Sequence, residues 1–340
     1  MICLLFICMP YFFMFLEHFY SRKPIVEKEI YGVVGKHTKP DEVYGIIREF
    51  LKRGGKRFRP LLCLSCAGAV GGNIKDALNA AAAIELFHNF TLIHDDIEDN
   101  SQMRRAEPCL HIKYGMPLAI NAGDGLFMLV WKTALGKGGK DSAESQKILL
   151  SAFTSVLEGQ AMELSWHREN RWDITKEDYL KMAGGKTASL ISASCHAGAL
   201  LGGADASICK RLSTFGYKLG LAFQIQDDLL NLVGDEKKYK KEIGGDIREG
   251  KRTLMVLDCL KKLSAADAKK MRKILGEEGA TNDEISWCIE KMRSTGSLGA
   301  ASKYATSLVE EAKKEISPLK ESEDKTDLLS VARYIISREE

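Results

Sequence analysis

Proline is scarce in this sequence of 340 residues: there are seven, and none lies between Pro117 and Pro318. A segment that long without proline favours one helix after another, because proline removes a backbone donor and clashes with the preceding turn. No stretch alternates apolar and polar residues strongly enough to predict a strand, and there is no repeat of fixed period or low-complexity linker. These absences favour a single all-α domain, and the hydrophobic content of 45% is enough for its core.

The charge balance and the cysteines argue against a nucleic-acid-binding protein, a disulfide-rich protein and a zinc site. The net charge of +3 is too small to indicate a nucleic-acid partner. Nine cysteines are scattered without a framework, which fits a reducing cytoplasm. Cys63 and Cys66 form a CxxC inside the apolar run "PLLCLSCAGAV", and no second pair follows at zinc spacing. We expect two buried helix residues there.

The N-terminus, "MICLLFICMPYFFMFLEHF", is apolar for 16 residues. A membrane span needs about 20, and a signal peptide needs a basic start and a small-residue cleavage site. Residues 1–24 are therefore a membrane anchor, an apolar helix packed on the body, or translated sequence upstream of the true start, with Met14 as an alternative start. We favour the last interpretation. Membrane association of an otherwise cytoplasmic protein would run through residues 1–16, and residues 25–340 would form the helical domain.

Helix signals continue along the chain. The segment "PDEVYGIIREFLKRGG" has acids in its first turn, basic residues in its last turn and glycine just beyond. A long alanine-rich apolar run covers residues 76–98. Further helices are predicted at about 116–135, 142–166, 175–183, 186–202, 206–233, 252–262, 265–276, 281–294, 297–316 and 323–337.

The segment "TLIHDDIEDNSQMRR", from Thr91 to Arg105, places four acidic residues inside five positions. A solvated surface turn is one interpretation. An EF-hand is excluded, because the sixth position counted from Asp96 is Ser101 and the closing glutamate is missing. On a helix, Asp95 and Asp99 lie one turn apart on one face. Two such carboxylates can hold magnesium, which would remove their repulsion.

A second aspartate pair, Asp227 and Asp228, follows an apolar helix in "LAFQIQDDLLNLVGD". The next loop, "KKYKKEIGGDIREGKRTL", is dense in lysine and glycine. Two aspartate pairs at helix ends, each followed by basic residues, indicate carboxylates that bind metals and cations that bind the same anion.

Two more basic elements occur at glycine breaks. "KRGGKRFRP" places Lys56, Arg57 and Arg59 at the entry to a helix, where an anion is readily bound. "GGKTASL" allows close backbone approach at Lys186, but it is not a Walker A motif, because Leu180 stands where the upstream glycine is needed. Alone, each patch is typical of a solvated surface. Together with the aspartates they indicate a helical bundle holding metals and two phosphorylated groups above an apolar interior.

The ordered motifs "GGKRFRP", "DDIED" with "RR" five residues on, "GGKTASL", "FQIQDDLLN" and "GGDIREGKRTL" resemble the trans-isoprenyl diphosphate (polyprenyl) synthases. The similarity is to the short-chain, archaeal-like geranylgeranyl/farnesyl type, and it runs from about residue 25 to the end. It implies one large all-α bundle around a deep central cavity, as a homodimer. It also implies a magnesium-dependent prenyltransferase that joins isopentenyl diphosphate to a dimethylallyl, geranyl or farnesyl diphosphate.

The resemblance assigns roles to residues by motif. Asp95, Asp99 and Asp227 would bind two to three Mg²⁺ ions, with Mn²⁺ as an alternative ion. Asp96 and Asp228 would support these ligands from outside the coordination sphere. The allylic diphosphate would be held by Arg104, Lys186, Thr187, Gln224, Lys241 and Lys251. Isopentenyl diphosphate would be held by Lys56, Arg59, His88 and Arg105.

Product length is expected to depend on the helix that carries Asp95. Counting back from Asp95, Phe90, Phe87 and Ile84 follow in steps of three and keep to a slowly drifting stripe. Farnesyl-type relatives often carry aromatic residues at both the fourth and the fifth positions before this aspartate. Here Phe90 is aromatic but Thr91 is small, which favours a C20 product, geranylgeranyl diphosphate, over the C15 farnesyl diphosphate. Ordinary core residues are the alternative for the stripe.

Three departures from the family pattern stand out. Asn231 replaces a frequent aspartate in the second motif, and Ala106 and Cys109 replace glycine and threonine after the arginine pair. The end, "SREE", lacks the basic tail that closes the site in some relatives.

Two other functions use similar residues. A terpene cyclase also ionises a prenyl diphosphate with aspartate-bound magnesium, but it needs no second diphosphate site. A non-catalytic modulating subunit would be expected to lose its aspartates, and here both pairs are intact. A magnesium-dependent prenyl-transfer assay separates all three.

Overall fold

The computed structural model describes residues 16–136, 142–234, 243–276 and 279–337. The contacts divide the chain into two compact units. Unit 1 comprises residues 1–151, 193–213 and 318–331, and unit 2 comprises residues 152–192, 214–317 and 332–340. Helices α8 (Ser142–Arg168), α10 (Ser189–Leu201), α11 (Ala206–Val233) and α18 (Glu323–Ser337) contribute residues to both units.

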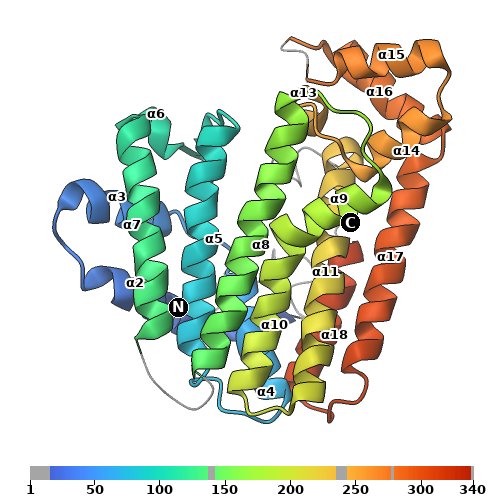
Figure 1. Cartoon of the computed structure of the whole chain (residues 1–340). Helices are drawn as coiled ribbons and strands as arrows, with labels where there is room; N and C mark the ends of the chain where they lie inside the picture. The colour runs from blue at the N-terminus through green and yellow to red at the C-terminus, as the bar shows by residue number, and fades with distance from the viewer. Residues whose placement is uncertain (1–15, 137–141, 235–242, 277–278, 338–340) are drawn as a thin grey trace, which may run out of the picture. The chain divides into compact units, whose positions relative to one another are not determined.

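Unit 1 is built almost entirely of helices, with one short hairpin. Its remaining elements are α1 (Glu17–Ser21), α2 (Lys23–Gly35), α3 (Asp41–Lys52), α4 (Phe58–Ala69), α5 (Leu78–Glu98), β1 (Met103–Arg104), β2 (Glu107–Pro108), α6 (Leu110–Tyr114) and α7 (Met116–Leu135). Helix α5 is its centre: it packs against α2, α4 and α7, and Figure 1 shows α5 and α7 side by side. Alanines fill the first half of α5, and alanine has the highest helix propensity. Because the alanine side chain is small, neighbouring helices can approach α5 closely on several sides.

Unit 2 is helical too. Its remaining elements are α9 (Lys176–Ala183), the π-helical turn η2 (Gly184–Ala188), α13 (Gly245–Arg248), α14 (Leu254–Lys262), α15 (Ala265–Ile274), α16 (Asn282–Ser294) and α17 (Ser297–Ile316). Helix α14 packs against α9, α15, α16 and α17. The predicted all-α class is thus confirmed, and most helix ends lie within two residues of their predicted positions.

Two local features differ from the expectation. The hairpin of β1 and β2 follows the acidic segment, where no strand was predicted. The segment around Lys186 was predicted as the start of an α-helix and is instead a π-helical turn between α9 and α10. Turns of this kind are short, and hydrophobic periodicity does not reveal them.

Residues 1–15 lie outside the described residues. Their interpretation as a membrane anchor, a packed helix or upstream sequence therefore stays a prediction. In the part of the N-terminal segment that is described, Leu16 and Phe19 are buried, and Phe19 contacts the ring of Phe58. Within the described ranges, none of the helices combines the length and the apolar character that crossing a membrane requires.

Candidate active site

The acidic segment ends helix α5 in a specific cap. Asn100 has a left-handed backbone with φ of +48°, and its N–H donates to the carbonyl of Ile97. The N–H of Ser101 donates to the carbonyl of Asp96, which completes a Schellman motif. Asp95 therefore lies in the last turn of α5 and Asp99 at its C-cap.

These two carboxylates fit a divalent cation. The Asp99 N–H donates to the Asp95 carbonyl at 2.8 Å, so the residues are one turn apart, and their side chains are partly exposed and exposed, respectively. Two acids at a helix C-terminus are unfavourable by themselves, because the dipole there is already negative. A hard cation with oxygen ligands relieves both the mutual repulsion and the dipole.

Asp96 points into the protein and does not share this position. It is 1% exposed, and Arg104 donates to its Oδ1 from Nε at 2.7 Å and from Nη2 at 2.5 Å. Cys109, buried nearby, has a pKa raised to about 12 by burial and by Asp96. Asp96 thus fixes Arg104 beside the last turn of α5.

The hairpin separates the two adjacent arginines. Arg105 and Ala106 form the two-residue loop between β1 and β2, both with positive φ (+55° and +64°), as a type I′ turn requires. Arg104 turns back to Asp96, whereas Arg105 donates to the carbonyl of Gly54 and, at 3.4 Å, to Asn89 Oδ1. The two adjacent arginines therefore serve different positions: Arg104 lies at the end of α5, and Arg105 lies at the glycine break before α4.

Arg105 belongs to a concentration of positive charge around the glycine break before α4. The guanidinium groups of Arg57 and Arg105 both lie next to Gly55. Arg59 Nη1 lies 3.3 Å from His88 Nε2. Burial lowers the pKa of His88 well below its usual value, and four nearby arginines lower it further. The guanidinium groups around this imidazole suit an anion, because charged donors form strong hydrogen bonds with phosphate oxygens.

The arginines in this group are not equivalent. Arg57 is fully buried and donates from Nη1 to Glu85 Oε1 at 2.9 Å, so its charge is already neutralised by a side chain of α5. Lys56, by contrast, is exposed. Unit 1 thus brings Arg59, His88 and Arg105 together at the glycine break that also carries Lys56.

In unit 2 the second aspartate pair, Asp227 and Asp228, also consists of a more exposed acid and a buried one, like Asp95 and Asp96 in unit 1. Asp227 is partly exposed, whereas Asp228 is 5% exposed. Asp228 accepts from Gln224 Nε2 and from the Tyr179 hydroxyl, both at 2.7 Å, and Gln224 Oε1 accepts from Thr187 at 2.6 Å. Burial raises the pKa of Asp228, and Asp246 raises it further. This chain of hydrogen bonds orders the turn of α11 that carries Asp227.

The turn η2 places Lys186 against helix α8. A Cβ at Gly159 of α8 would collide with the backbone nitrogen of Lys186, and one at Gly185 would lie 2.7 Å from the carbonyl oxygen of Ser155. Glycine at both positions is therefore needed for the close approach that "GGKTASL" predicts. The Lys186 ammonium forms an ion pair with Glu163 of α8.

Lys251 is the other described lysine predicted for the allylic diphosphate. Its ammonium lies 3.0 Å from Asp246 Oδ1 and 2.6 Å from Glu249 Oε2. Lys241 lies outside the described residues. Asn231, a departure from the family pattern, accepts the Asp246 N–H on its side-chain oxygen at 2.9 Å, so its amide anchors the segment that leads to Lys251.

The proposed product-length residues form part of an aromatic cluster in unit 1. Phe87 and Ile84 are fully buried and Phe90 is 7% exposed. The rings of Phe87 and Phe90 lie 6.2 Å and 5.0 Å from the ring of Phe127 on α7. Thr91 is partly exposed and donates to a backbone carbonyl of its own helix.

Sequence reasoning missed several participants. Glu163, Tyr179, Glu85 and Phe127 were not singled out, because each stands alone in a helical pattern without a motif. Only the three-dimensional contacts show that Glu163 and Glu85 face basic side chains and that Tyr179 faces Asp228.

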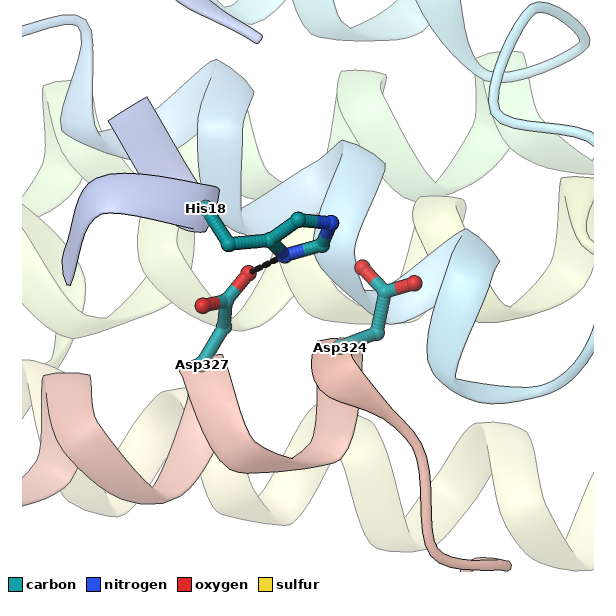
Figure 2. Close-up of side chains that lie close together, drawn as sticks. All are labelled: His18, Asp324 and Asp327. Atoms are coloured by element: carbon teal, nitrogen blue, oxygen red, sulfur yellow. Dashed lines mark hydrogen bonds and ion pairs between the residues drawn. The ribbon is translucent and has the colours of Figure 1, made fainter. Parts of the chain in front are cut away.

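A second group of potential metal ligands lies in unit 1, away from any predicted motif (Figure 2). His18 Nδ1 lies 2.7 Å from Asp327 Oδ2, and one donor atom each of His18, Asp324 and Asp327 fall within 4.8 Å of one another. Asp324, however, forms an ion pair with Arg22. Each carboxylate is thus matched by a basic side chain of α1 or of the residue before α2, and we interpret the group as a charge network that docks these helices on α18.

The fold and these residues define a class: an all-α enzyme fold with aspartate pairs on two helices and basic groups suited to diphosphates. The chain belongs to the polyprenyl synthetase family, whose model matches residues 40–292. It is 38% identical over 303 residues to a short chain isoprenyl diphosphate synthase of Methanothermobacter thermautotrophicus, covering 88% of this chain and 91% of that protein.

Two solved structures are also similar. Geranylgeranyl pyrophosphate synthetase from Pyrococcus horikoshii matches with a TM-score of 0.90 and 32% identity, over 96% of this chain and 99% of that chain. A polyprenyl synthase from Caulobacter crescentus, complexed with calcium and isoprenyl diphosphate, matches with a TM-score of 0.87 and 27% identity, over 97% and 98% of the two chains. The predicted family and the all-α fold are confirmed.

Proposed function

We propose that the protein is a prenyltransferase that condenses isopentenyl diphosphate with an allylic diphosphate and releases diphosphate, with geranylgeranyl diphosphate as its main product. The observation that carries the proposal is the division of both aspartate pairs into a more exposed acid that can bind metal and a buried acid that holds a neighbouring polar group. The names of the relatives support the same activity.

Magnesium is the proposed metal, with Asp95 and Asp99 as ligands in unit 1 and Asp227 as a ligand in unit 2. Carboxylate oxygens suit this hard cation, and the calcium-bound relative from Caulobacter crescentus fits a site for divalent ions. When bound, the metal supplies Lewis-acid stabilisation of the charge that develops on the departing diphosphate.

The chain's own cations act on the two diphosphates. Arg59, His88 and Arg105, with Lys56, are proposed to bind isopentenyl diphosphate, because guanidinium groups bind phosphate oxygens at two points. Neutral His88 serves there as a hydrogen-bonding partner that adds no further charge.

The allylic diphosphate is assigned to Arg104, Lys186 and Lys251, with Thr187 and Gln224. As the carbon–oxygen bond breaks, fixed cations stabilise the leaving group. The allylic cation left behind needs apolar surroundings that exclude water. The double bond of isopentenyl diphosphate then attacks it, and the new cation loses a proton to the released diphosphate, which leaves the double bond of the product. Thr187 offers an oxygen without charge, which can stabilise the cation but does not trap it.

The test is to incubate the purified chain with isopentenyl diphosphate and, in turn, dimethylallyl, geranyl and farnesyl diphosphate. The products are dephosphorylated and separated by chain length. We expect C20 as the main product with all three primers. A cyclic hydrocarbon formed from the primer alone would identify a terpene cyclase, and no product at all would support a non-catalytic subunit.

We further propose a cytoplasmic homodimer. The seven cysteines of the described ranges are buried and form no disulfide, which fits a reducing compartment. Leu150, Leu157 and Leu164 recur every seven residues along α8 and are 53%, 49% and 37% exposed, so this face of the helix fits a contact between two copies. Sedimentation of the wild type and of Leu157→Glu tests the contact: the wild type should be a dimer and the variant a monomer.

A further inference from the structure

Glu163 lies in unit 2 on helix α8, one turn after Gly159, where η2 packs against the helix. Its carboxylate forms an ion pair with Lys186, and only about a quarter of each side chain is exposed (23% for Glu163 and 26% for Lys186). An ion pair so sheltered from solvent holds its partners more firmly than one on an open surface.

Two lysines act on this carboxylate. Burial tends to raise the pKa of Glu163, but Lys186, Lys251 and the hydrogen bond from Lys186 lower it overall. Burial tends to lower the pKa of Lys251, but Asp246, Glu249 and Glu163 raise it overall. Glu163 contacts Lys186, whereas Asp246 and Glu249 contact Lys251.

The backbone and the carboxylate together fix the lysine from both ends. The turn η2 and Gly159 hold the Lys186 backbone against α8, and Glu163 from the same helix holds its ammonium. A lysine side chain has several freely rotating bonds, so an ammonium fixed in advance avoids the entropic cost of ordering it when the substrate binds.

We propose that Glu163 is a positioning residue for the allylic diphosphate: it orients Lys186 and balances its charge until the diphosphate arrives. This inference rests on the proposed function. It differs from a purely structural ion pair, which would affect folding and both substrates alike. It also differs from simple competition with the substrate, in which removal of the carboxylate would only tighten binding.

The experiment is steady-state kinetics of Glu163→Gln with the two substrates varied separately. We expect kcat to fall about tenfold, because the cation at the leaving group is no longer oriented, with less than about a threefold change in KM for isopentenyl diphosphate. Glu163→Asp keeps the charge and should recover part of the loss. Glu158→Gln, an exposed glutamate on the same helix, is the matched control and should behave as the wild type.

A double-variant cycle tests whether Glu163 acts through Lys186. If it does, Glu163→Gln combined with Lys186→Gln should be no slower than Lys186→Gln alone. Fully additive losses, an unchanged kcat with a lower KM for the allylic substrate, or equal losses for both substrates together with a lower melting temperature would each overturn the proposal. A wild-type chain without prenyl-transfer activity would instead refute the proposed function itself.

Discussion

Replacing Glu85 with glutamine removes the carboxylate that neutralises Arg57 in the interior of unit 1. The Arg57 side chain is fully buried and that of Glu85 is 3% exposed, with 2.9 Å between Nη1 and Oε1. Loss of one partner of a buried pair leaves an uncompensated charge and costs about 3–5 kcal/mol. Here Arg105 lies nearby and adds repulsion. We expect the free energy of unfolding to fall by about 4 kcal/mol, a large part of the about 5–15 kcal/mol typical of a folded protein.

The assay is urea denaturation followed by circular dichroism, and the matched control is Glu27→Gln. Glu27 faces the same guanidinium, with 3.6 Å between Arg57 Nε and Glu27 Oε1, but its side chain is 29% exposed. Because solvent screens such a pair, its loss should cost at most about 1 kcal/mol. Replacing both members of the buried pair, as in Arg57→Met with Glu85→Met, should recover most of the stability lost in Glu85→Gln. Equal losses in Glu85→Gln and Glu27→Gln would refute the argument that burial decides the effect.

Three further predictions concern the hairpin, a helix cap and the product. Ala106→Gly should stabilise the protein by about 1 kcal/mol in thermal unfolding, because Ala106 has φ of +64° and glycine adopts that conformation without strain; a loss of stability would contradict the turn assignment. Thr175 and Asp178 form the capping box of α9, and hydrogen bonds from Thr175 lower the pKa of Asp178 below 3.8. The stability that Asp178 contributes is therefore present above about pH 4 and is lost as the pH falls through the lowered pKa, so wild type and Asp178→Ala should converge in acid; a constant difference from pH 7 to pH 2 would exclude this linkage. Phe90→Ala and Phe87→Ala should each shift the products toward longer chains and the double variant further, and unchanged chromatograms would place the limit elsewhere.

The helices could be predicted well from the sequence because their signals are local. The apolar run at 76–98, the caps and the absence of proline each act within a few residues, and α5, α7, α11 and α17 follow the predicted bounds closely. The π-helical turn depends on the packing of Gly159 against Lys186, which lie far apart in the chain. No local pattern could have revealed it.

The site could be predicted to the level of residue types and motifs. Asp96 and Asp228 were expected to lie outside the coordination sphere, and both are buried and hydrogen-bonded. Their actual partners depend on tertiary contacts: Arg104 reaches Asp96 through the hairpin, and Tyr179 reaches Asp228 from α9. The assignment of each residue to a metal or a substrate stays a prediction.

The most direct test of the central claim is the magnesium dependence of prenyl transfer in Asp95→Ala, Asp99→Ala and Glu98→Gln. Transfer of the farnesyl group of the primer, farnesyl diphosphate, to labelled isopentenyl diphosphate is measured at increasing magnesium concentrations. Circular dichroism checks that each variant is folded. We predict that the wild type and Glu98→Gln are active and lose activity when magnesium is chelated, while both aspartate variants fold but are slower by about a hundredfold or more. Magnesium-independent activity, or an Asp95→Ala enzyme with nearly normal turnover, would contradict the account.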